Sequence, residues 1–127
     1  MKSPRQKIHG FTAALLLTFM ITRLYLWIFP HANINLGPYN IHHLYVGAVL
    51  LILTVILMVA GISNRIVIIL AGISSALILD QLVFLTATDG ADLTYLGKTS
   101  LWGGAVAVLI VAVLAQGVYW YKRKNNY

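Results

Sequence analysis

Residues 72–85 read GISSALILDQLVFL, which places the carboxylate of Asp80 and the amide of Gln81 inside an apolar run long enough to cross a bilayer. Moving an Asp side chain out of water is costly. Inside a membrane such a group survives by facing the interior of a helix bundle, a water-filled cavity or an opposite charge. The fold must therefore provide a partner for Asp80.

The composition is typical of a membrane protein. Of 127 residues, 60% are hydrophobic and only 9% are charged. Three long apolar runs, and a fourth interrupted only by Arg23, each reach the ~20 residues that a helical span requires. The sequence therefore predicts a single all-α domain, an integral membrane up-and-down four-helix bundle. Its spans are expected at about 8–29, 41–62, 66–87 and 101–121.

The charge pattern predicts a topology and not a nucleic-acid surface. The net charge is +6, but the basic residues flank the apolar runs and do not gather on one face. Seven of the nine fall on one side of the four spans, namely Lys2, Arg5, Lys7, Arg65, Lys122, Arg123 and Lys124. The positive-inside rule then puts both termini in the cytoplasm, in a bacterial-type plasma membrane. The chain has no cysteine, which excludes disulfides and thiolate metal sites.

Two opposite charges lie at one predicted depth. A rise of about 1.5 Å per residue places Arg23 about 24 Å above Lys7, and Asp80 about 22 Å above Arg65. Both then fall in the outer third of a core about 30 Å thick. We expect an ion pair between Arg23 and Asp80. The alternative is that Arg23 extends outward past Trp27 to the lipid head groups.

His42 and His43 open the second span, at the outer interface above this pair. Adjacent helix positions point about 100° apart, so at most one of the two faces the bundle interior. His43 shares a side with Gly47 and Thr54, which favours His43 as the inward one. The alternative is that both histidines are solvated at the interface.

An acidic loop follows the third span and contains Asp89, Asp92 and Tyr95. Carboxylates bind hard cations, and imidazole suits zinc. The loop residues could therefore join Asp80 or a histidine around a divalent metal. The first candidate ligands for such a metal are His42, His43 and Asp80. Asp and Gly are also common turn residues, and a solvated loop is the favoured interpretation of this segment.

These motifs resemble a group of small four-span bacterial membrane proteins of unassigned function. That group has a His-His pair opening span two, an Asp-Glu pair late in span three and an acidic, aromatic loop after it. Here His42 and His43, then Asp80, and then Asp92 and Tyr95 match the pattern over residues 20 to 100. Gln81 replaces the Glu of the group. The resemblance implies that the histidines and Asp80 act as a set, without a second carboxylate.

Three functions remain open. The first is a bundle that assembles with itself or with a larger membrane partner and binds an ion or a lipid head group at the outer polar cluster. Small residues spaced by four favour the close helix packing that such assembly needs, namely Gly72 with Ala76 and Gly103 with Ala107. The second is a membrane-embedded, metal-dependent hydrolase or lipid-modifying enzyme. The third is a proton-coupled permeation element in which Asp80 titrates and Arg23 is its counter-charge.

Overall fold

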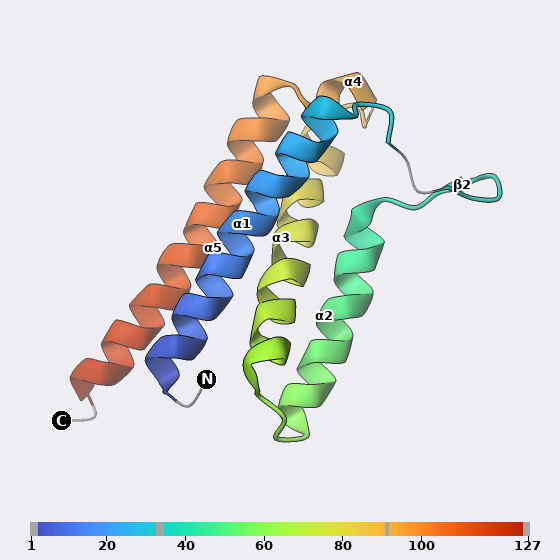
Figure 1. Cartoon of the computed structure of the whole chain (residues 1–127). Coiled ribbons are helices and arrows are strands. Elements are labelled where there is room, and N and C mark those ends of the chain that lie inside the picture. The colour runs from blue at the N-terminus through green and yellow to red at the C-terminus, as the bar shows by residue number, and fades with distance from the viewer. Residues whose placement is uncertain (1–2, 33–34, 91, 126–127) are drawn as a thin grey trace.

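The computed structural model describes residues 3–32, 35–90 and 92–125 (Figure 1). Only the backbone is described for Asn35, Tyr39, Asn40, Asp92 and Leu93.

The first helix, α1 (Pro4–Ile28), begins and ends where its sequence dictates. The Ser3 hydroxyl accepts a hydrogen bond from the Gln6 backbone N–H at 3.2 Å, and the Gln6 side chain accepts one from the Ser3 N–H at 3.4 Å. This capping box satisfies two N–H groups that a helix start leaves without partners. Phe29 caps the other end, and Pro30 follows with no N–H to continue the helix.

The second and third helices form a tight antiparallel pair. Helix α2 (His43–Val59) ends at Ala60, and Gly61 makes the turn with a φ of +82° that other residues rarely adopt. The Asn64 side chain then caps α3 (Arg65–Ala87) by accepting from the Val67 N–H at 3.0 Å. Before α2, the strands β1 (Asn35–Leu36) and β2 (Tyr39–Asn40) form a short hairpin.

The remaining helices close the fold above and beside α3. The short helix α4 (Asp92–Tyr95) follows α3, and the long helix α5 (Lys98–Asn125) then runs back down the molecule. The two termini of the described chain and the α2–α3 turn lie at the same end of the bundle, which we call the terminal end (Figure 1). Helix α4 lies at the opposite end of the bundle, which we call the α4 end. The Lys7 amino group donates to the Ser63 hydroxyl at 2.6 Å and so joins α1 to that turn.

The four long helices run alternately up and down, as the sequence predicts, and the all-α fold is confirmed. Helices α1, α3 and α5 pack against one another, whereas α2 packs chiefly against α3 (Figure 1). Helix α3 therefore lies at the centre and carries the largest set of buried residues. Helices α1 and α2 have little direct contact with each other.

Glycines allow two of these close contacts. A β-carbon on Gly72 of α3 would lie 2.5 Å from the Phe11 carbonyl oxygen of α1. A β-carbon on Gly47 of α2 would lie 2.9 Å from the Leu77 β-carbon and 2.9 Å from the Ser74 carbonyl oxygen of α3. Real β-carbons essentially never approach other atoms so closely, so both helix pairs depend on glycine.

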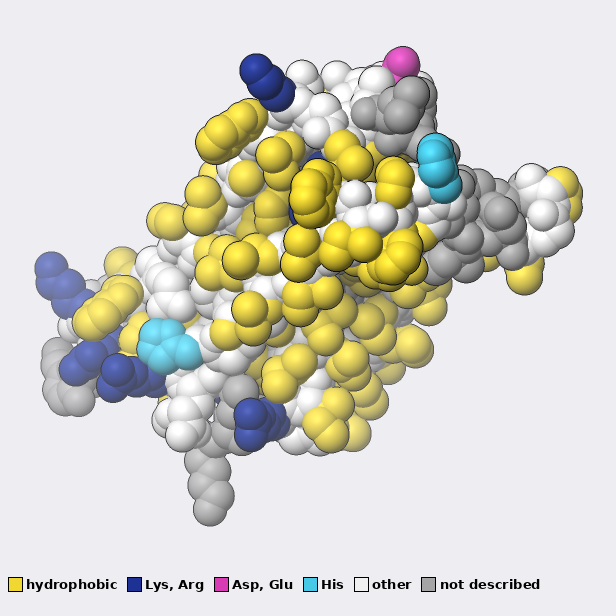
Figure 2. Space-filling model, turned by 45° about the horizontal axis from the view of Figure 1, so that its top comes forward, with side chains coloured by type: hydrophobic (Ala, Val, Ile, Leu, Met, Phe, Trp, Pro, Cys, Tyr) yellow, Lys and Arg dark blue, Asp and Glu magenta, His cyan; other side chains and the backbone are white. Residues whose placement is uncertain are grey.

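Three helices, α1, α3 and α5, are long and apolar enough to cross a membrane. Helix α2 has 17 residues, which gives a length of about 25 Å and makes it shorter than the predicted span. It is shorter because His42 keeps an extended backbone and caps the helix, and because the turn begins at Ala60. A broad band of hydrophobic side chains covers the face seen in Figure 2, and most of the Lys and Arg side chains visible there lie toward its lower end.

Candidate functional site

Asp80 is completely buried and is surrounded by hydrogen-bond donors. The Arg23 Nε donates to one carboxylate oxygen, Oδ1, at 2.6 Å. The second oxygen, Oδ2, accepts from the Tyr95 hydroxyl and lies 2.9 Å from His43 Nε2. The carboxylate thus receives contacts from α1, α2 and α4 at once, and the predicted ion pair between α1 and α3 is present.

Arg23 is 7% exposed and uses all three of its guanidinium nitrogens. Besides the bond to Asp80, Nη1 donates to the Tyr95 carbonyl oxygen at 2.6 Å. Nη2 donates to the Ser100 carbonyl at 3.1 Å and to the Ser100 hydroxyl at 3.0 Å. Arg23 therefore does not extend to the surface. It holds the start of α5 and the end of α4 against α1 and α3.

Tyr95 completes the enclosure of the ion pair. Its ring centre lies 4.1 Å from the guanidinium carbon of Arg23, within the range of a cation–π contact. The Phe84 ring packs against the Tyr95 ring in an edge-to-face arrangement, with ring centroids 5.2 Å apart. Burial raises the pKa of the Tyr95 hydroxyl above its ordinary value of 10.0, and the charge of Asp80 raises it further. The hydroxyl therefore keeps its proton and remains a donor to Asp80.

His43 connects the ion pair to Gln81. Its Nε2 lies 2.9 Å from Asp80 Oδ2 and also 2.9 Å from the Gln81 amide nitrogen. A ring nitrogen either donates or accepts, but not both. Next to an ionised carboxylate, Nε2 must carry the proton, because two acceptors at this distance would repel each other. The imidazole is thereby fixed as a donor toward Asp80, and the Gln81 amide nitrogen can donate only to the other ring nitrogen, Nδ1, which lies 3.4 Å away.

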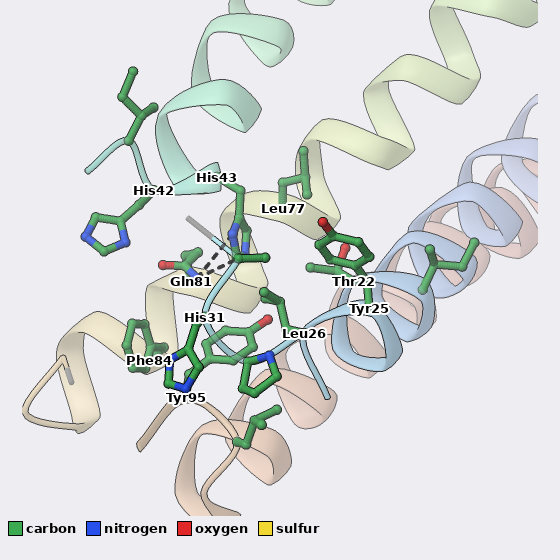
Figure 3. Close-up of a pocket in the computed structure, with 15 residues that line it drawn as sticks. Thr22, Tyr25, Leu26, His31, His42, His43, Leu77, Gln81, Phe84 and Tyr95 are labelled. Atoms are coloured by element: carbon green, nitrogen blue, oxygen red, sulfur yellow. Dashed lines mark hydrogen bonds between the residues drawn. The ribbon is translucent and has the colours of Figure 1, made fainter. Parts of the chain in front are cut away.

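The Gln81 amide is left with one end unpaired. Gln81 is 3% exposed, and its oxygen Oε1 is buried with no hydrogen-bond partner among the described residues. The oxygen points away from His43, and the nitrogen points toward it (Figure 3). If the amide turned by half a rotation, its oxygen could accept from His43 Nε2–H, and the NH₂ group would then lack a partner. In either orientation, one polar end of this buried amide lacks a partner among the described residues, and Gln81 is among the residues that line the pocket described below.

Small residues make room for the guanidinium group. A β-carbon on Gly104 would lie 3.0 Å from the Phe19 ring and 3.2 Å from Arg23 Nη2. Gly104 belongs to a buried stripe of α5, which consists of Ser100, Gly104, Val108 and Ala112. Gly103, which the sequence singles out together with Ala107, also lies at a close helix contact, because a β-carbon there would meet the Val83 side chain of α3. The regular spacing of four from Ser100 to Ala112 is the signal that could have identified the inward face.

The other predicted site residues lie apart from Asp80. His42 lies just before α2, and its ring points in a different direction from that of His43 (Figure 3), although both histidines line the pocket described below. Asp89 is exposed and accepts from the Thr94 hydroxyl at 2.7 Å. The side chain of Asp92 lies outside the described part of the chain.

The predicted metal ligands are not brought together. Within residues 3–32, 35–90 and 92–125, no three His, Cys, Asp or Glu side chains are grouped as metal ligands. The expected set of His42, His43 and Asp80 fails because adjacent positions at a helix start point in different directions. In addition, both oxygens of Asp80 are already engaged by Arg23, Tyr95 and His43.

A pocket of about 650 Å³ opens between α1 and α2 at the α4 end, next to this network (Figure 3). Its polar lining includes His43, Gln81 and Tyr95, and its apolar lining includes Leu26 and Leu77. Ile21 and Tyr25 also line it and are more than half exposed, so the pocket reaches the surface of the molecule along α1. None of the described lining residues is Lys, Arg, Asp or Glu.

The chain matches no known protein family, no curated protein and no solved structure. The resemblance to small four-span membrane proteins therefore stays a prediction. The function has to be inferred from the geometry of the site.

Proposed function

We propose that this chain is an integral membrane protein that binds the polar head of a lipid or another amphiphile in the pocket between α1 and α2. The observation that carries the proposal is the composition of this pocket, which has apolar side chains from α1 and α3 and a polar side formed by His43, Gln81 and Tyr95. Ligand sites are commonly concave and apolar with a few fixed polar groups, and their volumes run from about 300 to 1,000 Å³.

The ion pair supports this proposal by fixing the polar side of the pocket. Arg23 and Asp80 are both buried and do not line the pocket themselves. They instead hold Tyr95 and His43, which do line it, at defined positions. Preorganised polar groups bind a ligand without the cost of ordering them. The network therefore has a positioning role.

The location of the pocket supports an amphiphile over a water-soluble ligand. It lies at one end of helices that are long and apolar enough to cross a membrane, and its wall includes the exposed side chain of Ile21. An acyl chain leaving the pocket along α1 would continue past Leu17, an exposed apolar side chain one helical turn from Ile21. A free ion would find no charged side chain among the described residues of this lining.

The other functions considered have less support. For proton permeation, Thr54 and Ser74 are buried, but their hydroxyls donate to the carbonyls of Leu51 and Ala71 in their own helices. For assembly, the small residues expected to contact a partner pack within the chain, as Gly72 does against Phe11. Assembly with a second copy or a larger partner stays a prediction without this support.

The proposal is tested by filling the pocket. Leu26 lines it, whereas Leu24 on the same helix is 57% exposed and does not. The protein in detergent is incubated with a mixture of phosphatidylethanolamine, phosphatidylglycerol and diacylglycerol, and bound lipid is counted by native mass spectrometry. We expect one bound lipid in the wild type and in Leu24→Trp, and its loss in Leu26→Trp. Equal occupancy in the two variants, or no bound lipid in the wild type, would overturn the proposal.

A further inference from the structure

We infer that the ligand of this pocket is an uncharged amphiphile whose head carries a hydroxyl group, and that this hydroxyl bonds to the amide of Gln81. The inference rests on the proposed function and specifies its ligand class. It starts from the buried amide, which has one end without a partner among the described residues. A buried polar group without a partner is costly, so a ligand that supplies the missing hydrogen bond is favoured over one that does not.

A hydroxyl is the group that fits the amide in both orientations. When the amide nitrogen faces His43, as in Figure 3, the free oxygen needs a donor. When the amide is reversed, the free NH₂ group needs an acceptor. A hydroxyl both donates and accepts, whereas a carboxylate or phosphodiester only accepts and an ammonium only donates.

The charges around the pocket favour an uncharged head. Arg23 and Asp80 neutralise each other at 2.6 Å, and neither lines the pocket. The only titratable residues in the described lining are Tyr25, Tyr95 and three histidines, His31, His42 and His43. A charged head group would therefore be removed from water without a fixed counter-charge, which is unfavourable.

The shape of the pocket favours an amphiphile with a single small head. Leu26 and Leu77 lie on the apolar wall, and the Gln81 side chain lies on the polar side (Figure 3). A hydroxyl near Gln81 therefore leaves the attached chain against the leucines. Ligands of this class include monoacylglycerols and diacylglycerols, in which a hydroxyl-bearing glycerol is joined to an acyl chain.

The test compares three probes that share one acyl chain. Glycerol monooleate carries hydroxyls, methyl oleate has only acceptors, and oleate carries a negative charge. Their Kd values are measured for the whole protein in detergent by native mass spectrometry titration. We expect glycerol monooleate to bind about tenfold more tightly than methyl oleate, which corresponds to about 1.4 kcal/mol. Oleate should bind more weakly than glycerol monooleate.

The probes differ in how strongly they partition into detergent micelles, and measuring the same probes on a variant protein corrects for this difference. In Gln81→Leu, the ratio of the two Kd values should fall to about one third of its wild-type value or less, because the amide is gone while the probes are unchanged. Gln81→Met serves the same purpose if the leucine variant does not fold. Thr86→Val removes a hydroxyl from the same helix at an exposed position outside the pocket lining, and it should leave the ratio unchanged.

The outcomes separate this inference from the proposed function. If methyl oleate binds as tightly as glycerol monooleate, or if the ratio is unchanged in both Gln81 variants, the hydroxyl assignment is overturned while the pocket still binds lipid. If oleate binds most tightly, the ligand is an anion held by the histidines and the inference is again overturned. If no probe binds and Leu26→Trp has no effect, the proposed function itself fails.

Discussion

The Nε of Arg23 lies 2.6 Å from the Oδ1 of Asp80, although the two residues are 57 positions apart. Their side chains are 8% and 1% exposed. Because Arg23 also bonds to Tyr95 and Ser100, one guanidinium group joins α1 to α3, α4 and α5. This relationship fixes the α4 end of the bundle, where the pocket lies.

Replacing the acid of this pair should destabilise the protein strongly. In Asp80→Asn the charge of Arg23 stays buried without its counter-charge, and breaking a buried pair in this way costs about 3–5 kcal/mol. The free energy of unfolding in detergent, measured by denaturant titration, checks this. The matched control is Asp89→Asn, the same change at an exposed residue, with an expected effect within about 0.5 kcal/mol. Similar losses in the two variants would show that the ion pair does not hold the fold.

Adding one methyl group to Gly47 should separate α2 from α3. Its β-carbon would lie 2.9 Å from both Leu77 and the Ser74 carbonyl, and overpacking of this kind costs about 1–3 kcal/mol. Gly117 of α5 has nothing within 4 Å of the same position. Gly117→Ala should therefore stabilise the helix slightly, by up to about 1 kcal/mol. Thermal unfolding of both variants in one detergent measures the contrast, and a Gly47→Ala variant at least as stable as the wild type would contradict the packing described.

Removing the Tyr95 hydroxyl should have a pH-dependent effect. At pH 7, Tyr95→Phe loses a hydrogen bond to a charged group, which is worth about 1.5–3 kcal/mol. Burial and the charge of Asp80 raise the pKa of Tyr95 in the folded state above the 10.0 of an exposed tyrosine. Its stabilising effect is therefore complete below pH 10, and is lost above it as the unfolded chain ionises first.

The difference in unfolding free energy between the wild type and Tyr95→Phe should then shrink between pH 9 and pH 11. The phenylalanine variant has the same other titratable groups, so comparing the two chains isolates Tyr95. A difference that stays constant or grows over this pH range would contradict the burial of its hydroxyl.

The orientation predicted from the basic residues can be tested with single cysteines, since the chain has none of its own. Thr99 and Asn125 are exposed at opposite ends of α5. A membrane-impermeant maleimide added to intact cells should label Thr99→Cys, whereas Asn125→Cys should react only after lysis. The reverse pattern would place the basic terminal end outside and contradict the positive-inside assignment.

The part of the candidate site that depends on charge and on depth in the membrane was predictable from the sequence. A carboxylate and a guanidinium in two apolar runs must each find a partner, and counting residues from the basic flanks brings them level. That reasoning needs no knowledge of side-chain packing, and the structure contains the ion pair between Arg23 and Asp80. The inward position of His43 also followed from its spacing to Gly47 and Thr54, both of which are buried.

The sequence by itself thus determined the all-α fold, the alternating helices and the partner of Asp80, because apolar length and isolated charge act residue by residue. Only the tertiary structure decided which polar groups share a site. The contacts of Ser100 and Gly104 with Arg23, the separation of His42 from His43, and the unpaired end of Gln81 depend on how α1, α2 and α5 are rotated about α3. The length of a helix does not determine this rotation. The rotation is set by the positions of the small residues that allow two helix backbones to come close.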